Sequence, residues 1–313
     1  MRIYYAGDIH GSERCWRKFL NAAAFYEADV LVLGGDLTGK ALVPIVEQGP
    51  GRWQAHVLGR NEQIKGEEQL AEVEKRVRFN GFYPYRCSPD EYRRLEVEQE
   101  FRDQVISKTM IHELERWMSL ADEKLAHANV RCLVMPGNDD EFEIDPVIDR
   151  ARRVENPDGQ VVRVDGYQVL SSAWANPTPW DSPRELPEDE LEAKLETIAA
   201  ALDPAVPAIF NLHCPPYNSG LDMAPQLTDD LRVVTKGGEQ VLLPVGSRAV
   251  RAVIERHQPL LGLHGHIHES RYATTIGRTL CVNPGSVYAE GVIDGVIVDV
   301  DGGRVARHQF VQG

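Results

Sequence analysis

Residues 4–11 read Tyr-Tyr-Ala-Gly-Asp-Ile-His-Gly, an apolar run that stops at a polar turn between two glycines. The apolar residues predict a buried strand, and the glycines mark its end. Because side chains two apart in extended chain lie on one face, Asp8 and His10 can reach one point together. A carboxylate and an imidazole that converge at a strand end indicate a divalent-metal site. Taken alone, they would fit equally well a turn aspartate that caps the next helix beside a surface histidine.

Four later stretches repeat this arrangement of an apolar strand that ends in polar residues beside glycine or proline. Residues 29–36 end in Gly-Gly-Asp, residues 131–140 in Gly-Asn-Asp-Asp, residues 208–216 in His-Cys-Pro-Pro, and residues 260–268 in His-Gly-His-Ile-His. A helical pattern over 12–26 joins the first two strands, which predicts a βαβ unit with parallel strands. Their carboxyl ends then share one edge of the sheet, where open α/β sheets bind ligands.

These strand ends carry a set of candidate metal ligands, namely Asp8, His10, Asp36, Asn138, His213, His266 and His268. Oxygen and imidazole donors suit Mn, Fe, Zn, Co or Ni rather than a structural cysteine–zinc site. Seven donors exceed what one ion needs from the protein. Two divalent ions that share a bridging ligand are therefore the simpler interpretation.

The composition restricts the partners of the chain. A formal charge of −14 argues against a broad contact with a nucleic-acid backbone, so polymeric DNA or RNA is not an expected partner. Five separated cysteines form no Cys-x-x-Cys pair and indicate reduced thiols. No apolar run approaches the ~18 residues of a membrane span. The charge does not exclude a small phosphorylated substrate held locally by cations. We expect a cytoplasmic protein without membrane contacts; its oligomeric state stays open.

Residues 40–128 differ in character from the rest of the chain. They are rich in Glu, Lys and Arg, with helical periodicity around 66–80 and 90–127, one short strand at 53–58 and a loop at 81–85. We predict one domain over 1–313 into which 40–128 is inserted as a mostly helical subdomain. Because it leaves the core directly after Asp36, it would form a lid or cap over the metal edge; a dimerisation element is the alternative.

The ordered motifs D-x-H, G-D, G-N, H and G-H-x-H resemble the calcineurin-like metallophosphoesterases over 1–38 and 129–313. The resemblance implies an α/β (α+β) sandwich of two mixed β-sheets packed face to face and flanked by helices. It also implies two metal ions, Mn²⁺ first among the candidates, and a water between them as the nucleophile. The implied ligands are Asp8, His10 and His268 for one ion, Asn138, His213 and His266 for the other, and Asp36 as the bridge.

One position departs from the family pattern. The family usually has histidine after the asparagine, where it protonates or orients the leaving oxygen, but this chain reads Gly137-Asn138-Asp139-Asp140. An aspartate beside two dications should stay ionised, and an anion is a poor general acid. With Asn138 and Asp139 as the catalytic residues, we predict a preference for phosphodiesters and weak monoesterase activity. Alternatively, Asp139 caps the next helix and another residue supplies the acid.

Other residues carry weaker signals. His264, Asp140 and Asn283 could support the ligands from behind, although His264 fits a buried strand histidine equally well and Asp140 fits a backbone-orienting role. Lys40 and Arg271 could meet a substrate phosphate. Tyr217, in the Pro/Gly-rich connection over 214–245, could stack on a base or aryl group. Connections of that length in a compact domain are usually functional.

The sequence therefore predicts a metal-dependent phosphoesterase that favours a small, nucleotide-type phosphodiester. A non-catalytic metal-binding module on the same fold, a phosphomonoesterase and a nuclease are the alternatives. The presence of all seven candidate ligands favours the enzyme over the module, because a degenerate relative is expected to have lost some of them.

Overall fold

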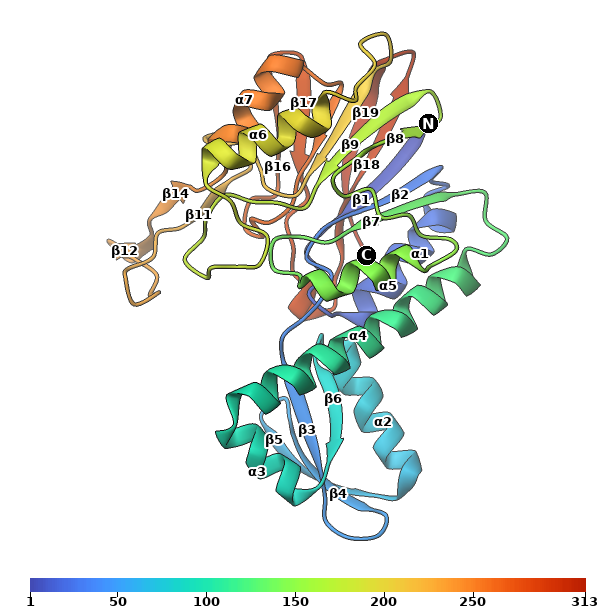
Figure 1. The fold of residues 1–313 in the computed structure, drawn as a ribbon, viewed down its shortest axis with the longest axis vertical. Coiled ribbons are helices and arrows are strands. Elements are labelled where there is room, and N and C mark those ends of the chain that lie inside the picture. Colours follow the sequence, from blue (N-terminus) through green and yellow to red (C-terminus); the bar gives the residue numbers. More distant parts are fainter.

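The computed structural model describes residues 1–313 and contains a sandwich of two mixed β-sheets (Figure 1). The strand order of the first sheet is β19-β18-β1-β2-β7. Its three parallel strands are β1 (Arg2–Ala6), β2 (Val30–Gly34) and β7 (Arg131–Met135). The antiparallel strands β18 (Asp294–Asp301) and β19 (Arg304–Gln312) complete it.

The second sheet has the order β16-β17-β15-β10-β9-β8. Its central strands run parallel: β9 (Tyr167–Ser172), β10 (Ala208–Leu212), β15 (Leu261–Leu263) and β17 (Thr279–Asn283). The outer strands β8 (Val161–Val164) and β16 (Tyr272–Ile276) are antiparallel to their neighbours. The prediction of two mixed sheets is thus confirmed.

Strand β1 shows how the layers form, because both of its faces are buried. Ile3 and Tyr5 pack into the core between the two sheets, whereas Tyr4 and Ala6 pack against helices on the outer face. Burial on both faces explains why β1 and β2 read as continuous apolar runs. The helices α1 (Glu13–Phe25) and α5 (Asp145–Asp149) cover the first sheet, and α6 (Glu188–Ala199) and α7 (Arg248–His257) cover the second.

The insert projects from one end of the sandwich and contains a sheet of its own (Figure 1). Its helices are α2 (Gly66–Phe79), α3 (Pro89–Val97) and α4 (Gln99–Lys124). Its strands, in the order β5-β4-β3-β6, are β3 (Leu42–Glu47), β4 (Arg52–Val57), β5 (Arg60–Lys65) and β6 (Tyr83–Cys87).

The sequence analysis expected only one of these strands, and the loop over 81–85 was wrong in its second half. Strand β5 has a single buried residue, Ile64, so it has no apolar periodicity to detect. Pro84 lies in β6, which is an edge strand, where the missing amide hydrogen is tolerated. Cross-strand pairing, not local pattern, makes these segments strands.

Helix α4 belongs to both parts of the molecule. Trp117 in its second half stacks on Trp16 of α1, with ring centroids 5.4 Å apart, and the Trp16 indole N–H donates to the Trp117 carbonyl over 3.2 Å. Met110 and Leu114 lie in the same core. The boundary at 128 was drawn from composition, and the exposed charged face of α4 dominates the composition of that segment. The boundary therefore assigns to the insert a part of α4 that packs in the main core.

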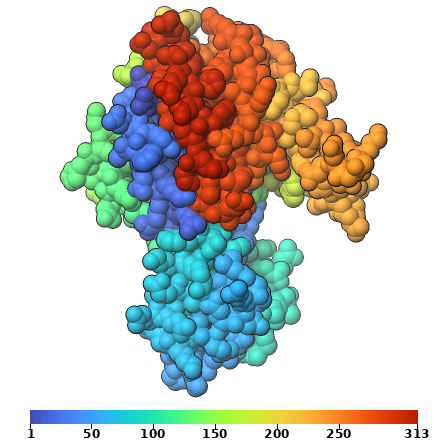
Figure 2. All heavy atoms as spheres, turned by 180° about the vertical axis from the view of Figure 1, so that it is seen from behind, coloured from blue at the N-terminus to red at the C-terminus, as the bar shows by residue number.

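Within the connection over 214–245, Cys214 and Leu221 pack into the core, and residues 223–245 form an arm that stands out from the sandwich (Figures 1 and 2). Strands β11 (Met223–Pro225) and β14 (Leu242–Pro244) pair near its base, and β12 (Thr235–Lys236) and β13 (Glu239–Gln240) pair near its tip. Two short 3₁₀ helices, η1 (Phe142–Ile144) and η2 (Tyr288–Glu290), follow β7 and β17. None of the helices combines the length and apolar character needed to cross a membrane.

Candidate metal centre

The carboxyl ends of parallel strands from both sheets meet at one edge of the sandwich. The loops that follow these strands are bonded to one another: the Asp8 amide donates to the Gly35 carbonyl, and the Gly265 amide donates to the His213 carbonyl, both over 2.9 Å. Because each loop leaves a different strand at the same edge, residues distant in sequence come together there. All seven side chains proposed as ligands lie at this edge, namely Asp8, His10, Asp36, Asn138, His213, His266 and His268.

The first group of side chains comprises Asp8, His10, Asp36 and His268, whose nearest ligand atoms lie within 4.8 Å of one another. His10 Nε2 is 3.1 Å from His268 Nε2 and 3.5 Å from Asp36 Oδ2. His268 Nε2 is 3.6 Å from Asp8 Oδ1. Two imidazoles and two carboxylates thus point at a common centre.

The second group comprises Asp36, His213 and His266, again within 4.8 Å. His213 Nε2 is 3.5 Å from Asp36 Oδ1 and 3.0 Å from Asn138 Oδ1, which adds the amide oxygen to this group. Asp36 therefore presents one carboxylate oxygen to each group. This sharing is what a pair of adjacent cations would require.

The surroundings of the two groups fit cations. Asp8 is fully buried, and its Oδ2 has no hydrogen-bond partner. Buried polar atoms are nearly always paired, so an orphaned carboxylate oxygen among imidazoles needs a positive partner. His213 Nδ1 lies 2.8 Å from the Gly34 carbonyl, to which its N–H can donate, and this leaves Nε2 for a ligand. The residues present could hold one divalent ion in each group.

Without a cation, protonation of histidine balances the carboxylate charge of the centre. Burial would raise the pKa of Asp36, but the histidines around it, His213 first, hold it well below its ordinary value. Burial would likewise lower the pKa of His213, but the charge of Asp36 and a hydrogen bond to it raise it to about 9. Burial and the nearby His213 lower the pKa of His266 to about 4. A proton on His213 thus offsets the buried carboxylate, a role that a cation would take over.

The backbone at the centre is strained. Asp8, His10, Asp36 and His266 have φ angles of 55°, 37°, 50° and 68°. Non-glycine residues rarely adopt positive φ, and such residues concentrate at functional sites where the surrounding structure enforces them. The sequence carried no clear sign of this strain, because aspartate and histidine, although enriched at positive φ among non-glycine residues, occur mostly at negative φ.

Glycines allow the loops to approach the carboxylates closely. A Cβ at Gly137 would lie 2.2 Å from Asp36 Oδ1, and one at Gly265 would lie 2.4 Å from Asp8 Oδ2. At Gly7, in the same region, the nearest atom would be 3.8 Å away. Side chains are therefore excluded at the first two positions but not at the third.

We expect Gly137→Ala to weaken Mn²⁺ binding by about 10- to 100-fold, because the methyl group displaces the Asp36 carboxylate and the support of a ligand has effects of this size. Gly7→Ala is the matched control and should bind Mn²⁺ as the unmodified protein does. Isothermal titration of metal-stripped protein measures both. Equal affinities in the two variants would contradict the assignment of Asp36 to a metal site.

Asp140 joins two of the loops from behind. Its buried carboxylate accepts hydrogen bonds from the backbone amides of Leu37, Thr38 and Gly137 over 2.8–2.9 Å, and from the Thr38 hydroxyl over 2.5 Å. Burial and the charge of Asp36 raise its pKa. It therefore positions the Asp36 loop against the Asn138 loop, the backbone-orienting role considered from the sequence.

Asn283 and His264 support the loops of the second sheet. The Asn283 amide nitrogen lies 3.0–3.2 Å from the carbonyls of Leu221, Gly265 and Ile267, which holds the loop that carries His266 and His268. His264 Nδ1 contacts the Leu212 and Cys214 carbonyls, and burial lowers its pKa to about 4. His264 is thus a buried neutral residue that braces the His213 loop.

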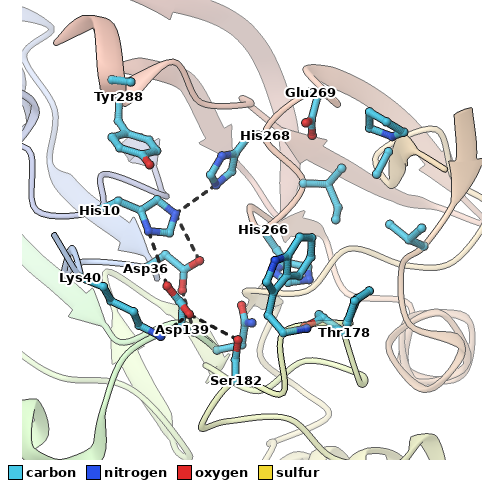
Figure 3. A pocket seen from close by; sticks show the side chains of 18 of the residues that line it. His10, Asp36, Lys40, Asp139, Thr178, Ser182, His266, His268, Glu269 and Tyr288 are labelled. Atoms are coloured by element: carbon cyan, nitrogen blue, oxygen red, sulfur yellow. Dashed lines mark hydrogen bonds and ion pairs between the residues drawn. The ribbon is translucent and has the colours of Figure 1, made fainter. Parts of the chain in front are cut away.

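The centre opens into a pocket of about 1250 Å³ whose wall includes Lys40, Asp139 and Ser182 (Figure 3). The Asp139 carboxylate accepts from the Lys40 ammonium over 2.6 Å and from the Ser182 hydroxyl over 3.3 Å, and its backbone amide donates to Asp36 Oδ1. The next helix, η1, follows Glu141 and has no side-chain cap. Asp139 therefore faces the pocket, and the alternative that it caps a helix was wrong.

Tyr288 was missed in the sequence analysis and lies beside the first group (Figure 3). Its ring centroid is 4.8 Å from that of His10 and 5.9 Å from that of His268. Only its position a few residues after the Asn283 turn could have drawn attention to it.

Arg271 and Tyr217, the two weaker substrate candidates, lie outside the pocket. Arg271 pairs with Asp294 over 2.6 Å, and Tyr217 packs beneath Arg248.

The insert borders the pocket through two short loops, 39–41 and 80–82. Gly11, Gly39 and Gly81 pack so closely there that a Cβ on any of them would lie within 3.1 Å of a backbone atom. The base of the insert is thereby fastened to the His10 loop. No residue of α2, α3 or α4 lines the pocket. A lid function would therefore have to act through these two loops at the base of the insert.

Fold and site together define a two-sheet α/β sandwich protein with a histidine- and aspartate-rich centre at one sheet edge. No family model matches the chain. The uncharacterized protein MJ1162 of Methanocaldococcus jannaschii is 33% identical over 168 residues, which span 52% of this chain and 68% of that protein. The chain belongs to the same family as MJ1162.

A solved structure shares the fold. The crystal structure of TT1561 of Thermus thermophilus aligns over 100% of this chain and 97% of its own with a TM-score of 0.56 and 16% identity. A structure described as a novel archaeal phosphodiesterase aligns over 99% of this chain and all of its own at 11% identity, with a TM-score of 0.32, which is too low to indicate a shared fold.

Proposed function

We propose that this protein is a metal-dependent phosphoesterase that hydrolyses small phosphodiesters. The observation that carries the proposal is the shared carboxylate: Asp36 directs one oxygen at each of two ligand groups at the bottom of an open pocket. Two adjacent cations are a common solution for displacement at phosphorus, since they act on both the attacking and the leaving oxygen.

Each ligand has a role in the proposal. Asp8, His10 and His268 would hold one ion, Asn138, His213 and His266 the other, and Asp36 would contact both. When bound, two divalent ions supply the positive charge that acidifies a water and stabilises phosphoryl oxygens. Mn²⁺ is the ion we would test first; Fe, Zn, Co and Ni accept the same donors.

The protein's own side chains favour a diester. Asp139 stands where a proton-donating histidine would serve a monoester, and its carboxylate is engaged by the Lys40 ammonium over 2.6 Å. The pair leaves no evident acid for a poor leaving group. A diester with a good leaving group needs no such acid, and Lys40 could shift toward one of its non-bridging oxygens.

We expect kcat/KM with Mn²⁺ to be at least about tenfold higher for bis(p-nitrophenyl) phosphate than for p-nitrophenyl phosphate. Asp139→His should raise turnover of an unactivated monoester by about 10²-fold, because a positioned general acid contributes 10²–10⁴. Asp301→His, at the exposed end of β18, is the control and should have no effect.

Two results would argue against the proposal. A monoester preference that survives in Asp139→Ala would contradict the reasoning about Asp139. Tight Mn²⁺ binding without turnover of any ester would favour the non-catalytic metal-binding module instead.

A further inference from the structure

We infer that the outer half of the pocket binds a bulky, uncharged apolar ester group, so that the substrate is a phosphodiester with one such group. This inference rests on the proposed function, because the same pocket would hold the phosphoryl group at the ligands. It follows from three features of the part of the wall formed by residues 177–180 and the arm, here called the outer wall: its composition, its construction from two separate segments, and its charge.

The first segment of this wall is the loop between β9 and α6. Pro177, Pro179 and Trp180 line the pocket, and Trp180 has 64% of its surface exposed. Large aromatic side chains are normally buried or engaged by a partner. An indole that lines a pocket beside two prolines offers a flat apolar surface with little polar competition.

The second segment is the arm. Leu227, Val233 and Leu243 line the same pocket, and Val233 and Leu243 are 44% and 40% exposed. The arm's base is anchored, since the Met223 amide donates to Ser270 Oγ over 2.7 Å. The Asn176 side chain donates to the Val245 carbonyl over 3.2 Å and so ties the loop to the arm. Two sequence-distant segments thus place apolar side chains around one space.

The charges of the pocket are confined to the metal side. Its charged side chains other than histidine are Asp36, Lys40, Asp139 and Glu269, and none lies on the loop over 177–182 or on the arm. A second phosphate or a carboxylate on the substrate would find no partner at the outer wall. The volume of about 1250 Å³ exceeds that of pockets for drug-sized ligands, which are ~300–1000 Å³, so a large ester group has room.

Aromatic and aliphatic ester groups share the apolar surface that this wall would cover. The test therefore uses p-nitrophenyl phosphodiesters with one leaving group and a second ester group that is methyl, n-hexyl or phenyl. With Mn²⁺, and after normalisation to the uncatalysed rates, we expect kcat/KM to be about tenfold or more higher for the hexyl or phenyl ester than for the methyl ester.

Trp180→Ala and the double variant Val233→Ser/Leu243→Ser should reduce this ratio toward one. Phe25→Ser, at a phenylalanine that is 78% exposed on α1, is the matched control and should keep the ratio. Unchanged thermal unfolding would show that the variants fold. If only the phenyl ester is preferred and Trp180→Ala abolishes that preference, Trp180 stacks on the aromatic group. If the hexyl and phenyl esters are both preferred, the wall is a general apolar site.

Turnover of the methyl ester without any preference in the unmodified protein would overturn the inference while leaving the proposed function intact. If no ester is turned over, the proposed function fails, and a binding measurement decides the inference separately. Trp180 is the only exposed tryptophan of the five. Protection of its fluorescence from acrylamide by phenyl phosphate, but not by methyl phosphate, would support the apolar site, and equal quenching would overturn it.

Discussion

Asp36→Asn is expected to lower kcat for bis(p-nitrophenyl) phosphate by at least about 10³-fold, which corresponds to about 4 kcal/mol of transition-state stabilisation. Asp36 is the one residue shared by both ligand groups, so its substitution weakens both proposed ions at once. The amide is nearly isosteric and can still accept the backbone hydrogen bond from Asp139. The loss would therefore report the missing charge rather than a collapsed loop.

The measurement combines kcat at saturating Mn²⁺ with the metal content of the purified variant. Asp301→Asn, at the exposed end of β18, removes a carboxylate far from the centre and should match the unmodified protein in both. Two bound Mn²⁺ per chain together with normal turnover in Asp36→Asn would contradict the shared role of this carboxylate.

Metal removal is expected to lower the melting temperature by about 5 to 10 °C. At a free Mn²⁺ concentration 100 times the dissociation constant, one site stabilises the folded state by about 2.7 kcal/mol. Each kcal/mol shifts the melting temperature of a protein of roughly this size by about 2–4 °C. The structural cause is the burial of Asp8 and Asp36, whose charges need a positive partner. Differential scanning calorimetry before and after chelation measures the shift.

The fall in melting temperature on metal removal should grow as the pH rises from about 6.5 toward 9. The pKa of His213 is raised from 6.5 to about 9 in the folded protein, so its proton stabilises the metal-free fold fully below 6.5. That contribution is lost as the pH approaches 9, whereas a bound cation requires the neutral imidazole. The pKa of His266 is lowered to about 4, so this residue does not titrate between pH 6.5 and 9.

Asp36→Asn supplies the control for the thermal experiment, because Mn²⁺ should no longer stabilise it by the same amount. A melting temperature that does not respond to Mn²⁺ in the unmodified protein at pH 8.5 would argue that the two groups hold no cation.

Part of the fold could be predicted because the information was local. Strands β1, β2, β7 and β10 are buried on both faces and therefore read as continuous apolar runs. Helix α1 was recognisable from its apolar spacing and its cap, where Ser12 accepts from the Cys15 amide. By contrast, β5 has few apolar residues and becomes a strand by pairing with β4 in a hairpin. Strand β6 contains a proline and pairs with β3, about 40 residues earlier in the chain.

The amino-acid sequence by itself indicated a parallel βαβ unit and nominated seven polar side chains at the strand ends, because strand ends and their glycines occur as short contiguous motifs. The two-sheet sandwich was expected only from the family that these motifs resemble. Only the tertiary structure decided that Asp36 divides its oxygens between two groups, that Asp139 turns into the pocket toward Lys40, and that Trp180 and the arm enclose an apolar space. Those features depend on the distance between segments that no local pattern relates. Periodicity and turn chemistry specify which face of an element is buried, whereas packing between elements specifies what that face meets.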